Sequence, residues 1–228
     1  MTHPIVSHEE WVTARKALMA KEKEFTRLRD ELAAERRALP WEKVEKHYSF
    51  EAPEGRVTLP DLFGGKSQLI VYHFMFGPDY EEGCPSCSFW ADSFNGLDVH
   101  LAARDTALVA VSRGPLALFA PYKKRMGWSF RWVSSAGSDF NYDYGVSKRP
   151  DEKVLQYNYG TIERKFDEHP GFSAFVREDG AIFHSYSTYA RGLDPMNAAY
   201  QLLDLTAKGR QEEGLPFPMA WVRRRDRY

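Results

Sequence analysis

Two cysteines three positions apart are the residues of this chain best suited to chemistry. Cys84 and Cys87 lie in the run Cys84-Pro85-Ser86-Cys87, and the 228 residues contain no other cysteine. A pair this close in sequence cannot join distant parts of a fold, so it favours redox or metal chemistry over structural cross-linking. A structural zinc site needs four ligands, and neither a second cysteine pair nor an HxxxH pair is present. The pair predicts redox chemistry without a metal or a cofactor.

The position of the pair predicts different roles for the two cysteines. If Cys84 caps a helix, Pro85 falls at the first helical position, where a missing N–H costs nothing. The free N–H groups of Ser86 and Cys87 then point toward the Cys84 sulfur and stabilise its thiolate. The helix dipole adds roughly 0.3–1 kcal/mol, which is less than one pKa unit. In this hypothesis Cys84 is the attacking thiolate and Cys87 resolves the mixed disulfide.

Neighbouring acidic residues leave an alternative open. Asp79, Glu81 and Glu82 precede Cys84, and their charges raise its pKa if they lie close to the sulfur. The alternative is a pair of reduced cysteines at a helix start that never turns over.

Three aromatic or imidazole side chains near the pair are further candidates. His73, in the strand before the cysteine loop, has an ordinary pKa near neutrality and is a candidate proton shuttle for Cys87. A satisfied core histidine is the alternative. Trp90 and Tyr80 are candidates for the walls of the site, although core packing explains them equally well.

The elements that position the pair alternate strand and helix. The apolar run at 67–76 predicts a central strand that is covered on both faces. A loop then leads to a helix predicted over 84–104, a strand at 107–112, a helix at 116–126 and a strand at 130–134. This alternation favours an α/β sheet with a parallel portion.

The flanking segments predict strands, a hairpin and a last helix. Short strands are expected at 47–50 and 57–59, and residues 136–170 show no sustained periodicity. The sequence Glu178-Asp179-Gly180 between 172–177 and 182–189 is typical of a hairpin turn. A final helix is predicted over 195–208, with Gly209 placed to end it.

The N-terminal segment predicts one long amphipathic helix over 8–38. Ser7 and Glu10 have the spacing of a capping box, and Pro40 marks the stop. Apolar residues recur at every seventh position: Trp11, Leu18, Phe25, Leu32 and Leu39. Such a stripe packs on its own domain or on a second copy, so a homodimer through this helix is a hypothesis. The expected organisation is a helical extension at 1–40, a main domain at 41–210 and a tail at 211–228.

Composition and charge exclude several functions. Thirty-one Lys and Arg offset 32 Asp and Glu, giving a net charge of −1, so no positive field is available to attract nucleic acid or an anionic membrane. The run Arg223-Arg224-Arg225 is expected to be a solvated tail. The first residues contain no apolar run typical of a signal peptide, and no stretch approaches the ~20 apolar residues of a membrane helix. A cytoplasmic location is expected.

Motifs along the chain resemble the thioredoxin-like family catalogued as domain of unknown function 899. The resemblance lies in GCPSCSFWAD at 83–92, LIVYHFMFGPDYEEG at 69–83, FHSYSTYARGLD at 183–194 and AYQLLDLTAKGR at 199–210. With the long N-terminal helix it covers nearly the whole chain. It implies an α/β fold with a thioredoxin-like mixed sheet flanked by helices, whereas the family's name assigns no activity.

Two positions depart from thioredoxin itself. The tryptophan that thioredoxins carry before the first cysteine is Gly83 here. The cis-proline that precedes the hairpin strand in thioredoxins falls near residue 172, and the nearest proline is Pro170. The resemblance implies that Pro170, with Pro85, Ser86 and Trp90, contacts the substrate. It also places His73 about where thioredoxins have a buried acid.

A peroxiredoxin-like peroxidase is an alternative within the same fold. Its site resembles Pro-x-x-x-Thr-x-x-Cys, but the residue three before Cys84 is Glu81 and the residue three before Cys87 is Cys84. The activating threonine is therefore missing.

The function predicted from the sequence is that of a dithiol–disulfide oxidoreductase. Its partner is a thiol or disulfide of a protein or small molecule. The non-enzymatic alternative is a thioredoxin-like scaffold that binds a ligand through the tyrosine-rich stretch 142–159 and the region 186–191.

Overall fold

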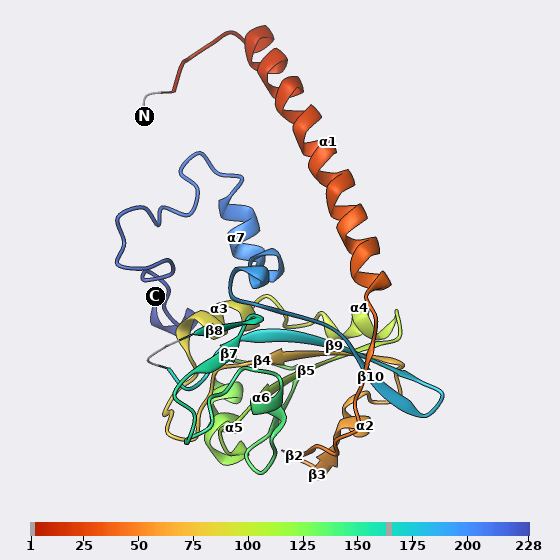
Figure 1. The fold of residues 1–228 in the computed structure, drawn as a ribbon. Coiled ribbons are helices and arrows are strands. Elements are labelled where there is room, and N and C mark those ends of the chain that lie inside the picture. Colours follow the sequence, from red (N-terminus) through yellow and green to blue (C-terminus); the bar gives the residue numbers. More distant parts are fainter. Residues whose placement is uncertain (1–2, 163–165) are drawn as a thin grey trace. The chain divides into compact units, whose positions relative to one another are not determined.

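The computed structural model describes residues 3–162 and 166–228, and the chain divides into two compact units, Met1–Pro40 and Trp41–Tyr228. Helix α1 (His8–Ala38) makes up most of the first unit, as predicted (Figure 1). The predicted capping box is present: the Glu10 N–H donates to the Ser7 hydroxyl at 3.3 Å, and the Ser7 N–H donates to the Glu10 carboxylate at 2.9 Å. None of the helices in the described part of the chain is long and apolar enough to span a membrane.

A mixed sheet forms the second unit. Among the described residues, eight strands pair in the order β1-β10-β9-β4-β5-β6-β2-β3. Their bounds are β1 (Glu42–Lys43), β2 (Ser49–Ala52), β3 (Gly55–Thr58), β4 (Gln68–His73), β5 (Thr106–Ser112), β6 (Arg131–Ser134), β9 (Gly171–Glu178) and β10 (Ala181–Tyr189). Strands β4, β5 and β6 are parallel, whereas β9 is antiparallel to β4. The order β10-β9-β4-β5 is that of the thioredoxin fold. A separate hairpin consists of β7 (Leu155–Tyr157) and β8 (Gly160–Ile162).

Strand β4 lies inside the sheet because its side chains are apolar on both faces, as the continuous run predicts. Tyr72 and Phe74 belong to a first core on one face, which also contains Cys87. Leu69 and Val71 belong to a second core on the other face. Successive residues of a strand alternate between faces, so the parity of a position in β4 decides which core its side chain enters.

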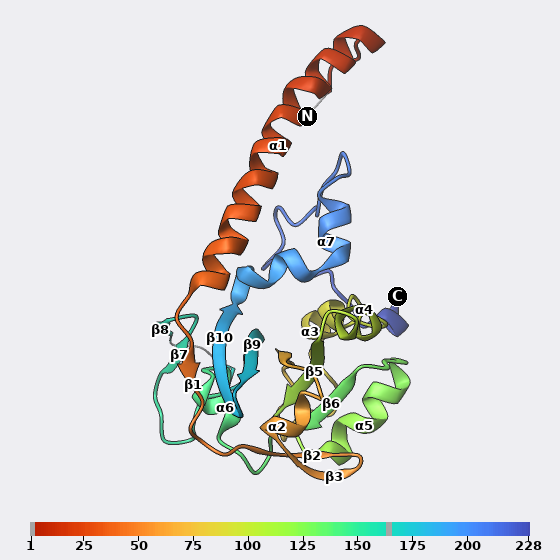
Figure 2. The ribbon, with the colours of Figure 1, turned by 90° about the vertical axis from the view of Figure 1, so that its right-hand side faces the viewer.

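Helices cover both faces of this sheet. The elements are α2 (Leu59–Leu62), α3 (Pro85–Ala91), α4 (Asp98–Ala102), α5 (Leu116–Arg125), α6 (Phe140–Asp143), α7 (Ala198–Leu203) and the 3₁₀ turns η1 (Ala190–Met196) and η2 (Arg225–Arg227). Figure 2 shows α3, α4 and α5 on one side of the sheet and α6 on the other. The first core lies under α3 and α5, and the second core contains Phe140 of α6.

Two helix predictions were wrong in length. The helix predicted over 84–104 is two short helices, α3 and α4, separated at Gly96, whose φ of +83° is a left-handed conformation. The helix predicted over 195–208 is limited to α7, because Asn197 caps its start by accepting from the Tyr200 N–H at 2.9 Å. The predicted hairpin around Asp179 and Gly180 is confirmed, with both residues at positive φ.

Candidate active site

The cysteine pair lies at the start of α3, directly after the loop that follows β4. Cys84 is the N-cap residue, and Pro85 occupies the first helical position, as the sequence predicts. Both cysteines are free thiols; Cys84 is half-buried, and Cys87 is only 2 % exposed. The Ser88 N–H and hydroxyl both donate to the Cys84 carbonyl, at 2.9 and 2.8 Å. These two bonds fix the turn that brings the thiols together.

Hydrogen bonds stabilise Cys84 as a thiolate. The largest contribution is the bond from the Cys87 thiol, followed among the favourable ones by the backbone N–H groups of Cys87 and Ser86. The positive charge of Arg224 acts in the same direction, while burial opposes them. Together they lower the pKa of Cys84 from 9.0 to about 7. Cys84 is therefore the more acidic thiol of the pair.

Cys87 is perturbed in the opposite direction. Burial, and then the hydrogen bond and charge of Cys84, raise its pKa well above the ordinary value. Tyr72 of β4 lies beside it, with its hydroxyl donating to the Cys87 carbonyl at 3.2 Å. Cys87 therefore remains a thiol at neutral pH while its neighbour ionises.

Glu82, which was expected to oppose the thiolate, is compensated by arginines. Its carboxylate pairs with Arg125, with Arg224 at 2.8 Å and with Arg227 at 3.3 Å. The hydrogen bond from Arg125 is the main reason that the pKa of Glu82 is lowered. The interpretation of Arg223-Arg224-Arg225 as a solvated tail is wrong for Arg224, which also donates from Nε to the Gly83 carbonyl at 3.1 Å.

Gly83 has no room for a side chain. A Cβ at this position would lie 2.5 Å from Cε1 of Tyr122 and 2.9 Å from Cζ of Phe74. The tryptophan of thioredoxins therefore has no space here, because Tyr122 fills it. The Tyr122 hydroxyl lies 2.7 Å from Oγ of Ser88, which in turn holds the Cys84 carbonyl.

The structure does not bring His73 to the cysteines. Its ring stacks on Phe140 and Tyr144 on the face of the second core, and its Nε2 lies 2.8 Å from Oγ of Ser173. Burial lowers the pKa of His73 to about 3, with a smaller contribution from His184. His73 is buried in the second core, but it is not the fully satisfied histidine of the alternative, because its Nδ1 is buried without a hydrogen-bond partner among the described residues. The physical reason for its distance from the cysteines is that successive residues of a strand point to opposite faces of the sheet. Tyr72 faces the cysteine pair, so His73, the next residue, points to the other face.

The proposed wall residues lie in different surroundings. Trp90 is 5 % exposed, and its Nε1 donates to the Leu193 carbonyl at 2.8 Å, so it anchors η1 to α3. Tyr80 is nearer to the chemistry: burial and then the charges of Glu168 and Cys84 raise its pKa to about 12. Pro85 and Ser86 are half-buried beside Cys84.

Pro170 directly precedes β9, at the end of the sheet where Gly171 pairs with His73. Its peptide bond is trans, and its carbonyl accepts from the Tyr157 hydroxyl at 2.8 Å. A contact of Pro170 with the substrate stays a prediction.

A cavity of about 380 Å³ lies beyond the ends of β5 and β6; most of its lining comes from 113–115 and 135–139, and the tyrosine-rich stretch 142–159 contributes Tyr142. Tyr142 forms one wall and receives a hydrogen bond from Arg113 at 3.0 Å. Arg113 is also paired with buried Glu168 at 2.6 Å. Across residues 3–162 and 166–228, no group of three or more His, Cys, Asp or Glu side chains is arranged to hold a metal ion.

Tyr72, Tyr122 and Arg224 are the residues at this site that the sequence did not single out. Alternation along β4 carries a signal for Tyr72, because it places residues 70, 72 and 74 on one face. Tyr122 and Arg224 come from elements whose approach to the pair depends on the whole fold.

The fold and the site define a thioredoxin-fold protein with a Cys-x-x-Cys pair at a helix start. The family model described as "Bacterial protein of unknown function (DUF899)" matches residues 1–228, and the chain belongs to this family. Comparison with curated proteins gives no match.

Solved structures similar to this chain include three peroxiredoxin-type proteins. The peroxidoxin BcpB of Mycobacterium tuberculosis is 14% identical, with a TM-score of 0.47 over 72% of this chain and 97% of that one. PrxQ of Xylella fastidiosa is 11% identical, with a TM-score of 0.45 over 72% and 96%. Peroxiredoxin Q of Xanthomonas campestris is 15% identical, with a TM-score of 0.44 over 68% and 89%.

Proposed function

We propose that the protein is a dithiol–disulfide oxidoreductase in which Cys84 attacks and Cys87 resolves. The observation that carries this proposal is the opposite perturbation of the two thiols. The pKa of Cys84 is lowered to about 7, and that of Cys87, one helical turn further on, is raised. Opposed pKa values in a close pair are typical of an assigned nucleophile and its partner.

The first step is attack of the Cys84 thiolate on one sulfur of a substrate disulfide. The substrate S–S bond breaks, a mixed disulfide forms with Cys84, and the first substrate sulfur leaves as a thiolate that takes a proton from water. The Cys87 thiol then gives up its proton and attacks the Cys84 sulfur. The second substrate thiolate leaves and takes that proton. Two electrons have moved to the substrate, and the protein holds a Cys84–Cys87 disulfide.

Ionisation of Cys87 is the demanding part of this cycle. Burial is the largest cause that raises its pKa, and the hydrogen bond and charge of Cys84 raise it further. Formation of the mixed disulfide removes this charge. The Tyr72 side chain and the Met75 backbone both hydrogen-bond to Cys87 in the sense that favours its thiolate. Capture of the substrate thus makes Cys87 easier to ionise, although its burial remains.

The substrate is a disulfide of a protein or small molecule. It reaches Cys84 at the start of α3, where Pro85 and Ser86 are half-buried. A second dithiol compound must reduce the Cys84–Cys87 disulfide to complete a turnover. A reducing compartment such as the cytoplasm supplies such donors.

The experiment that tests this proposal is insulin reduction with dithiothreitol as the electron donor. Wild type should accelerate the reduction well above the uncatalysed rate. Cys84→Ser should return the rate to background, and Cys87→Ser should form a mixed disulfide that is not resolved. Far-ultraviolet circular dichroism checks that the variants remain folded. Equal rates for wild type and Cys84→Ser would refute the reductase activity.

A further inference from the structure

The C-terminal residues 221–228 lie against the cysteine helix. Figures 1 and 2 both show the C-terminus beside α3. Val222 is 5 % exposed, and the Trp221 ring contacts Phe89 of α3 with centroids 5.5 Å apart. The Asp226 carboxylate accepts from Nε of Arg125 at 2.7 Å. The chain end is therefore held by apolar burial as well as by ion pairs.

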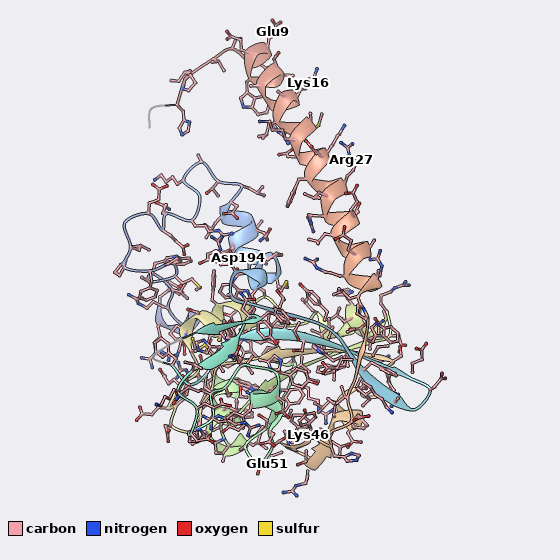
Figure 3. The ribbon with its side chains drawn as sticks, viewed as in Figure 1. Glu9, Lys16, Arg27, Lys46, Glu51 and Asp194 are labelled. Carbon is pink, nitrogen blue, oxygen red and sulfur yellow. The ribbon has the colours of Figure 1, made fainter. Side chains whose placement is uncertain are left out.

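The preceding segment is tied to the same unit. Arg210 pairs with Asp194 at 2.9 Å, and Figure 3 shows Asp194 at the base of α7. Glu212 accepts hydrogen bonds from Trp221 Nε1 at 2.8 Å and from the Tyr200 hydroxyl at 2.7 Å. These contacts determine the path along which the last residues return to the cysteine loop.

This path of the chain brings Arg224 next to the cysteine loop. Its guanidinium bridges the two residues before Cys84: Nη1 lies 2.8 Å from the Glu82 carboxylate, and Nε donates to the Gly83 carbonyl at 3.1 Å. Only 20 % of its side chain is exposed. A guanidinium with two hydrogen-bonded partners is held in one orientation, because its donors form a rigid fork.

Charged side chains surround this contact. Arg125, Arg224 and Arg227 surround Glu82, and Asp226 supplies a second carboxylate. The ion pairs around Glu82 thus contain three guanidinium groups and two carboxylates, and Arg225 pairs separately with Asp92 at 3.5 Å. The Cys87 thiol and the hydroxyls of Tyr72 and Tyr80 also lie near Cys84, and their raised pKa values keep all three neutral at pH 7.

We propose that Arg224 is a positioning residue of the thiol site: the C-terminal segment carries the cation that fixes the Glu82-Gly83 backbone and favours the Cys84 thiolate. The inference deepens the proposed oxidoreductase function and rests on it for its catalytic meaning. A reactive cysteine beside a fixed arginine is a better nucleophile at neutral pH, because more of it is ionised. Burial alone would have the opposite effect.

The test measures the thiolate directly in the full-length protein, without substrate. The pH dependence of thiolate ultraviolet absorbance is recorded for wild type, Arg224→Gln, Arg224→Lys and Arg223→Gln. Gln keeps an N–H donor without the charge, and Lys keeps the charge without the fork. Arg223 is the matched control, because it is exposed and hydrogen-bonds to carbonyls of its own segment.

We expect the Cys84 midpoint of Arg224→Gln to rise by roughly 0.5 pKa unit, which is about a threefold loss of thiolate below the midpoint. Arg224→Lys should recover part of the change, and Arg223→Gln should match wild type. An unchanged midpoint in Arg224→Gln, or an equal rise in the Arg223 variant, would overturn the inference. If Arg224→Gln does not fold, Arg224→Met, which keeps most of the length of the side chain without its charge, takes its place: a rise of roughly 0.5 pKa unit supports the role of the charge, and an unchanged midpoint opposes it. Insulin reduction is measured separately, so a shifted midpoint without turnover would refute only the oxidoreductase function.

Discussion

Tyr72 and Cys87 are joined by a hydrogen bond of 3.2 Å from the phenolic hydroxyl to the cysteine carbonyl. The bond ties the central strand to the first turn of α3. Tyr72 therefore lies beside Cys87, where His73 was predicted to lie. Neighbouring residues of one strand thus have separate surroundings: Tyr72 faces the thiols, and His73 lies in the second core.

Replacement of Tyr72 by Phe should affect both stability and chemistry. The ring still fills the first core, so the loss should be limited to one hydrogen bond, about 0.5–1.5 kcal/mol in the free energy of unfolding. Resolution of the mixed disulfide should slow, because Cys87 loses a group that lowers its pKa. Urea unfolding and single-turnover reaction with a chromogenic disulfide measure the two effects. Tyr159→Phe, at an 80 % exposed residue, is the control; a faster or unchanged resolving step in Tyr72→Phe would contradict the assignment.

Removal of the Cys87 thiol should make Cys84 less acidic. The hydrogen bond from Cys87 is the largest cause of the lowered pKa of Cys84. In Cys87→Ala the alkylation rate by iodoacetamide should therefore reach its midpoint above the wild-type value of about 7, closer to 9.0. Cys84→Ala should leave almost no reaction at neutral pH, because Cys87 is buried and protonated. A Cys87→Ala profile that overlays wild type would show that the thiol contact does not determine the pKa.

A methyl group at Gly83 should disturb the site, whereas one at Gly137 should not. The Cβ of an alanine at position 83 meets Tyr122 and Phe74 at distances below 3.0 Å, while a Cβ at position 137 meets no atom within 4 Å. Overpacking of this kind costs about 1–3 kcal/mol. Gly83→Ala should lower the thermal midpoint and slow alkylation of Cys84. The prediction fails if Gly83→Ala and Gly137→Ala are equally stable.

Burial of His73 should make the protein sensitive to acid. The folded-state pKa of about 3 lies below the ordinary 6.5, so the unfolded chain binds a proton between these values and the folded chain does not. His73 therefore favours the folded state fully above pH 6.5, and this contribution is lost as the pH falls toward 3. The expected slope is about 1.4 kcal/mol per pH unit within that window.

The measurement is the free energy of unfolding against pH for His73→Gln and wild type. Their difference should change across the window and become constant above pH 6.5. His100→Gln is the matched control, since His100 is exposed on α4. Parallel curves for wild type and His73→Gln would mean that His73 binds its proton at the same pH in the folded and unfolded chains.

Helix α1 offers a test of the homodimer hypothesis. Its apolar residues recur at every seventh position, and Phe25, in the middle of the stripe, is 60 % exposed. If the stripe joins two copies, wild type should sediment as a dimer and Phe25→Glu as a monomer. Lys23→Glu places the same acid on another face and should remain a dimer. A monomeric wild-type protein would refute this dimer.

The sequence predicts the sheet better than it predicts the site. Strand β4 and the hairpin around Gly180 could be predicted because an apolar run and an Asp-Gly turn are local signals. The helix over 84–104 was too long, because apolar periodicity continues through Gly96 even though the backbone turns there. Cys84 as N-cap follows from the proline after it. The contact between Arg224 and Gly83 could not be predicted in this way. The two residues are 141 positions apart in the sequence, and they come into contact only when the C-terminal segment folds back.

The central claim is that Cys84 and Cys87 form a reversible redox pair, and equilibration in glutathione buffers tests it most directly. Free thiols are trapped by alkylation and counted by mass spectrometry at a series of ratios of reduced to oxidised glutathione. Both thiols of wild type should disappear together into one intramolecular disulfide and return on reduction. Cys87→Ser should give only a mixed disulfide with glutathione at Cys84. Two thiols that remain free at every ratio would show that Cys84 and Cys87 are not a redox pair.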